Sequence, residues 1–151
     1  MTYSLSQALP TTTALTNFQQ KLADAKKLTF RIDFDSEKIL ASSFSPAERK
    51  VLEQHCSQHK LSLESTHLPK TLDVVSDYIT KIPELTITMA VEPNKSIIQT
   101  LSELLHVQLK KAVVLTFRID TSIVAGAKLE FQGKVQSHTI ANTIEKVFYE
   151  K

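Results

Sequence analysis

The chain has 151 residues, of which 42% are hydrophobic and 23% charged, which suits one ordinary domain or two small ones. Its 18 Lys and Arg residues against 16 Asp and Glu residues give a net charge of +2, so no strong electrostatic attraction to nucleic acid or to a membrane surface is expected. Its two glycines, Gly126 and Gly133, are too few for the glycine-rich loops that bind phosphates or dinucleotides.

Cysteine content and hydropathy predict a soluble, cytoplasmic protein. Cys56 is the single cysteine, which excludes an intrachain disulfide and a cysteine-rich zinc site and fits a reducing compartment. Residues 1–8 lack the basic start and the apolar run of a signal peptide. The longest apolar stretch, at 112–115, is far shorter than the roughly 20 residues of a membrane-spanning helix.

In the first half, a polar segment at 1–13 is expected to form a loosely held arm. A helix should follow, because apolar residues then recur at steps of three and four: Leu15, Phe18, Leu22 and Ala25. Strict alternation at 28–34 predicts a half-buried strand. Ser45, Pro46 and Glu48 form a helix-start pattern with a capping box, and that helix should run to about Gln58.

A short strand at 61–64 and a helix at 72–79 complete the first half. The second half predicts the order β-α-β-β-β-α, with strands at 85–89 and 113–119, a helix at 94–111, a hairpin at 127–135 and a closing helix at 138–150. We expect the apolar stripe of the helix at 94–111 to be core, and the closing helix to dock on its own domain in preference to a partner.

The predicted fold class is α+β: a small mixed β-sheet with covering helices in the C-terminal half, preceded by a helix-containing region with one or two strands. We divide the chain at residue 70, into 1–70 and 71–151. The hexapeptide Leu-Thr-Phe-Arg-Ile-Asp occurs at 28–33 and again at 115–120. Either an internal duplication or two strands with similar burial requirements would explain this repeat.

No group of residues points to catalysis or to a cofactor. His55 and His59 lie one helical turn apart and could share a metal, but zinc needs three or four ligands, so a solvated helix end is preferred. Asp33 and Asp35 are expected to cap the segment that follows them rather than to perform acid–base chemistry. We therefore assign no catalytic, cofactor-binding or metal-binding residue.

The segment 119–126 is the most specific pattern. Asp120 and Ser122 can turn the chain after a strand, and Ala125 and Gly126 let it restart as a hairpin. Gly133 is expected to take a positive φ in the turn of that hairpin.

From about Thr71 to Lys151 the chain resembles the C-terminal region of the delta subunit of F-type ATP synthases, called OSCP in mitochondria. That family carries a Val-Asp-Pro-Ser-Leu-Ile-Gly-Gly signature, which corresponds here to 119–126. Thr121 replaces the motif proline, Ala125 replaces its first glycine, and 137–139 read Ser-His-Thr where the family has Asp-Gly-Ser. These replacements keep turn-forming and small residues, as a divergent member would.

The resemblance implies a non-catalytic peripheral-stalk subunit of a proton-translocating F-type ATP synthase, with no cofactor. Its partners would be a helix of the b-type stalk subunit and the α subunits of the catalytic head, and it would meet the membrane only through the complex. Residues 1–70 would be a reduced head-binding domain. The signature and hairpin residues Asp120, Ser122, Ala125, Gly126 and Gly133 would be structural, with an interface role as a further expectation.

Two other hypotheses stay open. The chain could be a stand-alone α/β adaptor for protein–protein interaction, derived from an internal duplication. It could also be a small metal- or thiol-dependent enzyme centred on His55, Cys56 and His59.

Overall fold

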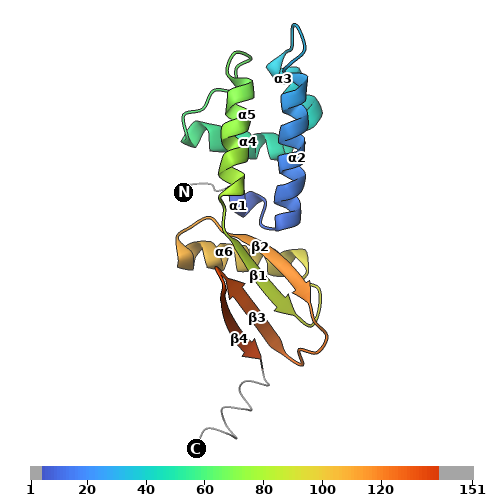
Figure 1. The fold of residues 1–151 in the computed structure, drawn as a ribbon, viewed down its shortest axis with the longest axis vertical. Coiled ribbons are helices and arrows are strands. Elements are labelled where there is room, and N and C mark those ends of the chain that lie inside the picture. Colours follow the sequence, from blue (N-terminus) through green and yellow to red (C-terminus); the bar gives the residue numbers. More distant parts are fainter. Residues whose placement is uncertain (1–4, 140–151) are drawn as a thin grey trace, which may run out of the picture. The chain divides into compact units, whose positions relative to one another are not determined.

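The computed structural model describes residues 5–139, in which helices are followed by a mixed four-stranded sheet (Figure 1). The chain forms two compact units. Within the described residues, the N-terminal unit comprises 5–9 and 13–82, and the C-terminal unit comprises 10–12 and 83–139. The predicted α+β fold class is confirmed.

The described part of the N-terminal unit is helical. Its helices are α1 Leu5–Ala8, α2 Thr12–Leu28, α3 Ser36–Ser43, α4 Pro46–Gln58 and α5 Leu68–Thr80. The predicted capping box opens α4: the Glu48 backbone N–H donates to Ser45 Oγ at 3.3 Å, and the Ser45 N–H donates to the Glu48 carboxylate at 2.8 Å. This exchange satisfies two backbone donors that a helix start leaves without partners.

The core of the N-terminal unit lies between these helices. The predicted stripe of α2 is buried along its whole length: Leu15, Phe18, Leu22 and Ala25. The Phe18 ring lies 5.4 Å from that of Phe44, between centroids. Ion pairs tie α2 to α4 through Lys21 and Glu48 and to α5 through Lys26 and Asp73, although such partly exposed pairs contribute little stability.

Two strands predicted in this half are wrong. At 28–34 the helix α2 runs on to Leu28, the Thr29 hydroxyl donates to the Lys26 carbonyl at 2.7 Å, and the chain then turns. At 61–64 the backbone N–H of Leu61 closes the end of α4 on the Cys56 carbonyl at 2.8 Å. In both places the backbone forms local hydrogen bonds at a helix end. Its N–H and C=O groups are therefore not available for pairing with a strand.

The described part of the predicted N-terminal arm is also ordered. Leu5 and Ser6 of α1 are buried. In the C-terminal unit, the Pro10 carbonyl accepts from the Leu115 N–H at 2.8 Å, and the hydroxyls of Thr12 and Thr116 hydrogen-bond to each other. Backbone pairing to a strand therefore holds a segment that its polar composition had predicted to be loose.

The sheet of the C-terminal unit has the strand order β2-β1-β3-β4. Its elements are β1 Glu84–Met89, α6 Lys95–Leu109, β2 Val114–Ile119, β3 Gly126–Phe131 and β4 Lys134–Thr139. β1 is parallel to β2 and antiparallel to β3, with Leu85 opposite both Leu115 and Phe131. A parallel pair needs a crossover, and α6 supplies it.

This order confirms the predicted β-α-β-β-β series, including the hairpin. β4 extends to Thr139, and the rest of the predicted closing helix at 138–150 lies outside the described residues. One face of the sheet carries the buried core residues Leu85, Ile87 and Leu115, and Val113, just before β2, joins the same core. Leu101 and Leu105 of α6 pack against them, so α6 covers this face.

Candidate interaction site

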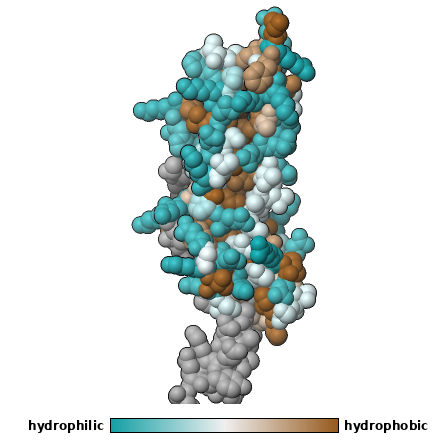
Figure 2. Space-filling view, viewed as in Figure 1, coloured by the Kyte–Doolittle hydropathy of each residue, from teal (hydrophilic) through white to brown (hydrophobic). Residues whose placement is uncertain are grey.

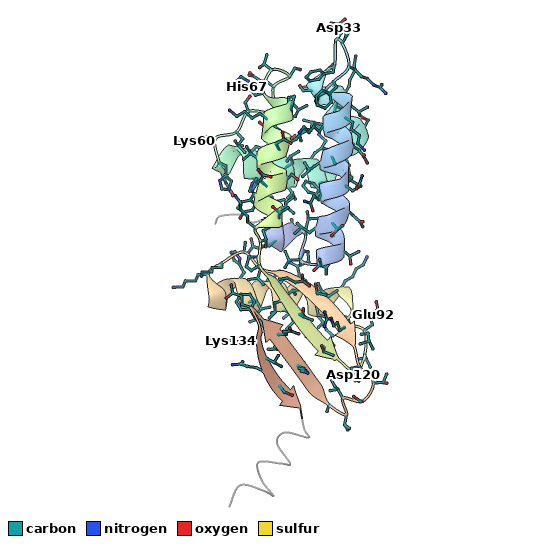
Figure 3. The ribbon with its side chains drawn as sticks, in the orientation of Figure 1. Asp33, Lys60, His67, Glu92, Asp120 and Lys134 are labelled. Carbon is teal, nitrogen blue, oxygen red and sulfur yellow. The ribbon has the colours of Figure 1, made fainter. Side chains whose placement is uncertain are left out.

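The connection between β2 and β3, where Asp120 is labelled in Figure 3, is a turn held by side-chain hydrogen bonds. Asp120 Oδ1 accepts from the Ser122 backbone N–H at 3.0 Å and from its hydroxyl at 2.6 Å, while the Asp120 N–H donates to the Met89 carbonyl at 2.9 Å. The hydrogen bonds from Ser122 lower the pKa of Asp120 below its ordinary value. The charged carboxylate is therefore the form that holds the turn.

The two glycines are required by backbone conformation. Gly126 starts β3 with a φ of 101°. Gln132 and Gly133, at φ 50° and 77°, form the two-residue turn between β3 and β4, the geometry that favours glycine in hairpins. Nothing lies within 4 Å of a Cβ built on Gly133, so its φ, and not space, selects glycine there.

The structure thus brings Asp120, Ser122, Ala125 and Gly126 together in one connection, while Gly133 lies at the other end of β3. Exposed apolar side chains lie around the connection: Val91 after β1, Ile119 at the end of β2, and Val124 within the turn itself. Because the Asp120 N–H reaches the Met89 carbonyl, the ends of β1 and β2 are adjacent. Figure 2 shows hydrophobic surface at this end of the C-terminal unit.

The outer side of α6 is the second apolar feature. Asn94 caps the helix by accepting from the Ile97 N–H at 2.9 Å. The side chains of Ile97, Leu104 and Val107 are 42%, 53% and 73% exposed. Their spacing of seven and three residues places them on one side of the helix, and we call them the α6 stripe.

The expectation that the whole apolar stripe of this helix is core is therefore wrong in part. Leu101 and Leu105 face the sheet, and the α6 stripe faces outward. The sequence carried a signal for this division, because apolar residues at 97, 98, 101, 104, 105 and 107 span more than one face of a helix.

His55 is not the solvated residue that the sequence suggested. Its side chain is buried, and its ring lies 4.4 Å from that of His59 and 4.6 Å from that of Tyr78, between centroids. Burial, with a smaller effect of the His59 charge, lowers the pKa of His55 to about 4. This three-ring cluster packs α4 against α5.

Cys56 is also buried, and burial raises the pKa of its thiol to about 11. It is therefore protonated at neutral pH and lacks the thiolate that a nucleophilic cysteine requires. Among residues 5–139, no group of three or more His, Cys, Asp and Glu side chains could hold a metal ion. The geometry gives the thiol or metal hypothesis no support.

The remaining candidate residues lie at the surface. Asp35 caps α3 by accepting from the Glu37 N–H at 3.0 Å, as predicted, and Asp33 is exposed in the preceding loop.

Within residues 5–139, no helix is both long and apolar enough to cross a membrane.

A comparison with known protein families matches most of the chain. The family model described as ATP synthase delta (OSCP) subunit matches residues 36–149. The match therefore includes α3, α4 and α5 of the N-terminal unit as well as the sheet and α6. A comparison with curated proteins gives no match.

Proposed function

Since this chain belongs to the ATP synthase delta (OSCP) subunit family, whose members are non-catalytic peripheral-stalk subunits, we propose that it ties the b-type stalk helices to the α subunits of the catalytic head in a proton-translocating F-type synthase. In this role it resists the torque of rotation through interface area and stiffness. It stands on the cytoplasmic side and meets the membrane only through the complex.

The C-terminal unit is the proposed stalk-binding part. The observation that carries this assignment is the α6 stripe, a row of three exposed apolar side chains on a helix whose other side is fixed to the sheet. An amphipathic helix binds such a row through its own apolar residues at i, i+3, i+4 and i+7. The b-type helix is the partner of this kind that the family supplies.

The signature residues stabilise the sheet on which α6 packs. The Asp120 turn and the positive φ of Gly126 fix the connection from β2 to β3, and these strands belong to the sheet on which α6 lies. We propose a structural role for Asp120, Ser122, Ala125, Gly126 and Gly133. An interface role is proposed for the exposed apolar side chains beside them, Val91, Ile119 and Val124.

The N-terminal unit is the proposed head-binding part. The family match begins at residue 36 and includes α3 to α5, which supports treating these helices as part of the reduced head-binding domain. Its partners would be the α subunits of the catalytic head.

Calorimetric titration of the full chain with the C-terminal helix of the b-type subunit from the same organism tests the stalk assignment. We expect saturable one-to-one binding with the negative heat-capacity change of apolar burial. Val107→Asp should weaken binding about tenfold or more, because it places a charge where an apolar side chain is buried.

The matched control is Val135→Asp. Val135 is also an exposed valine, but it lies opposite Glu130 on the sheet face away from α6, so this variant should bind like the natural chain. Equal weakening by both substitutions would contradict the assignment to the α6 stripe. Absence of any binding would favour the stand-alone adaptor.

A further inference from the structure

The loop between α2 and α3 exposes large apolar side chains. Phe30 and Ile32 are 76% and 93% exposed, and Ile32 is the most exposed large hydrophobic residue of the described chain. Figure 2 shows hydrophobic surface at the end of this loop, where Asp33 is labelled in Figure 3. The loop lies before residue 36, so it is outside the family match.

Within residues 5–139, the backbone and charged side chains of this loop form few and long interactions. The Phe30 and Arg31 N–H groups make long hydrogen bonds of 3.4 and 3.3 Å to the preceding helical turn. Within residues 5–139, neither Arg31 nor Asp33 forms an ion pair with another side chain. Asp33 has a φ of 62°, in the left-handed region that Asp adopts more readily than most residues with a side chain.

The same sequence forms a strand elsewhere in the chain. Leu-Thr-Phe-Arg-Ile-Asp at 28–33 is repeated at 115–120, where the residues up to Ile119 belong to β2 and pair with β1. A β-strand depends on its neighbours more than on intrinsic propensity. What the copy at 28–33 lacks is therefore a partner strand, and not the ability to extend.

The sequence of the loop is complementary to itself. Phe30-Arg31-Ile32-Asp33-Phe34 reads aromatic, positive, aliphatic, negative, aromatic. An antiparallel pair of two such segments centred on Ile32 places Phe30 opposite Phe34 twice and Arg31 opposite Asp33 twice. Aromatic and opposite-charge pairs are the cross-strand combinations that stabilise antiparallel strands.

We propose that this loop is a self-association site, in which residues 30–34 of a second copy of this chain pair with residues 30–34 of the first in antiparallel register about a two-fold axis. Such an interface uses the same patch on both copies, as closed dimers do. Pairing extends Asp33 from its left-handed φ and covers Phe30 and Ile32. Five residues from each copy bury less than the 1,200 Å² or so of a stable interface, so the dimer is weak.

Sedimentation equilibrium of the full chain, at concentrations up to about 1 mM where a weak dimer is populated, tests the proposal. We expect a reversible monomer–dimer equilibrium. Arg31→Asp places carboxylates opposite carboxylates, and Asp33→Arg places guanidinium groups opposite each other. Each single variant should weaken the dimer about tenfold or more.

The double variant R31D/D33R restores opposite charges with their signs exchanged, and its dissociation constant should return to within about threefold of the natural value. Lys50→Glu, a charge reversal at an exposed position of α4, controls for net charge and should leave the dimer unchanged. Circular dichroism of every variant checks that the helices remain folded.

Three results would overturn the proposal. A natural chain that stays monomeric over the whole concentration range has no such site. Association that both single reversals leave intact is unspecific contact through Phe30 and Ile32. Failure of the double variant to recover excludes the register centred on Ile32.

Discussion

His55 makes the stability of the N-terminal unit depend on pH. Its pKa falls from an ordinary 6.5 to about 4 because the ring is buried beside His59 and Tyr78. The unfolded chain therefore binds a proton between pH 6.5 and 4 that the folded chain does not bind. The unfolding free energy must fall as the pH drops through this window, and the contribution is fully present above pH 6.5.

The size of the effect follows from the shift. Each pKa unit corresponds to about 1.4 kcal/mol, so the loss attributable to His55 reaches about 3 kcal/mol near pH 4. His55→Phe keeps an aromatic ring against Tyr78 but cannot take up a proton. Relative to this variant, the natural chain should lose about 3 kcal/mol between pH 7.5 and 4.

Urea unfolding followed by circular dichroism at several pH values measures this difference. Cys56→Ala is the matched control, because Cys56 is a buried neighbour whose raised pKa, about 11, keeps it neutral throughout the window. The control should lower stability by a similar amount at every pH. If the difference in unfolding free energy between His55→Phe and the natural chain is the same at pH 7.5 and 4, the burial argument is refuted.

Three further predictions concern stability and are measured by urea unfolding. Phe18→Ala should lower the free energy of unfolding by about 3–5 kcal/mol, because the Phe18 ring is fully buried. Phe30→Ala in the exposed loop should change it by less than about 0.5 kcal/mol. Equal effects of the two substitutions would contradict the burial pattern. Ser45→Ala should cost about 1 kcal/mol by removing the capping box of α4, and no change would show the cap to be dispensable. Gly133→Ala should cost about 1 kcal/mol through its φ alone, since nothing crowds the position; a much larger loss would mean that the turn is more crowded than the structure shows.

The accurate sequence predictions concern elements in which local signals and tertiary packing agree. The capping box of α4 and the hairpin turn at Gly133 each depend on residues that are close together in the sequence, and both form as predicted. The predicted burial of the α2 stripe was correct because an amphipathic helix buries its single apolar face against the core.

The inaccurate predictions concern segments whose structure depends on a partner. The hexapeptide at 28–33 alternates as well as its copy at 115–120, but the second copy lies beside β1 and the first continues a helix end. Periodicity records how a segment can be buried and does not say whether a neighbouring strand is present. Burial of His55 was missed for the same reason, because Tyr78 comes from a different helix.

The candidate site was only partly predictable. The turn residues Asp120 and Ser122 were found through a sequence pattern, and they bond as expected. The α6 stripe was not separated from the core, because apolar periodicity does not distinguish the side that meets the sheet from the side that meets a partner. Leu101 and Leu104 differ by less than one helical turn, yet one contacts the core and the other is exposed.

The central proposal is that this chain, a member of the ATP synthase delta (OSCP) subunit family, holds the catalytic head of the synthase to its membrane sector. The most direct test removes the chain from the membranes of the organism that encodes it and measures how much ATPase activity stays membrane-bound, before and after the purified chain is added back. We predict that the head appears in the soluble fraction without the chain and returns to the membrane with it. A head that remains fully bound and coupled without the chain would contradict the account.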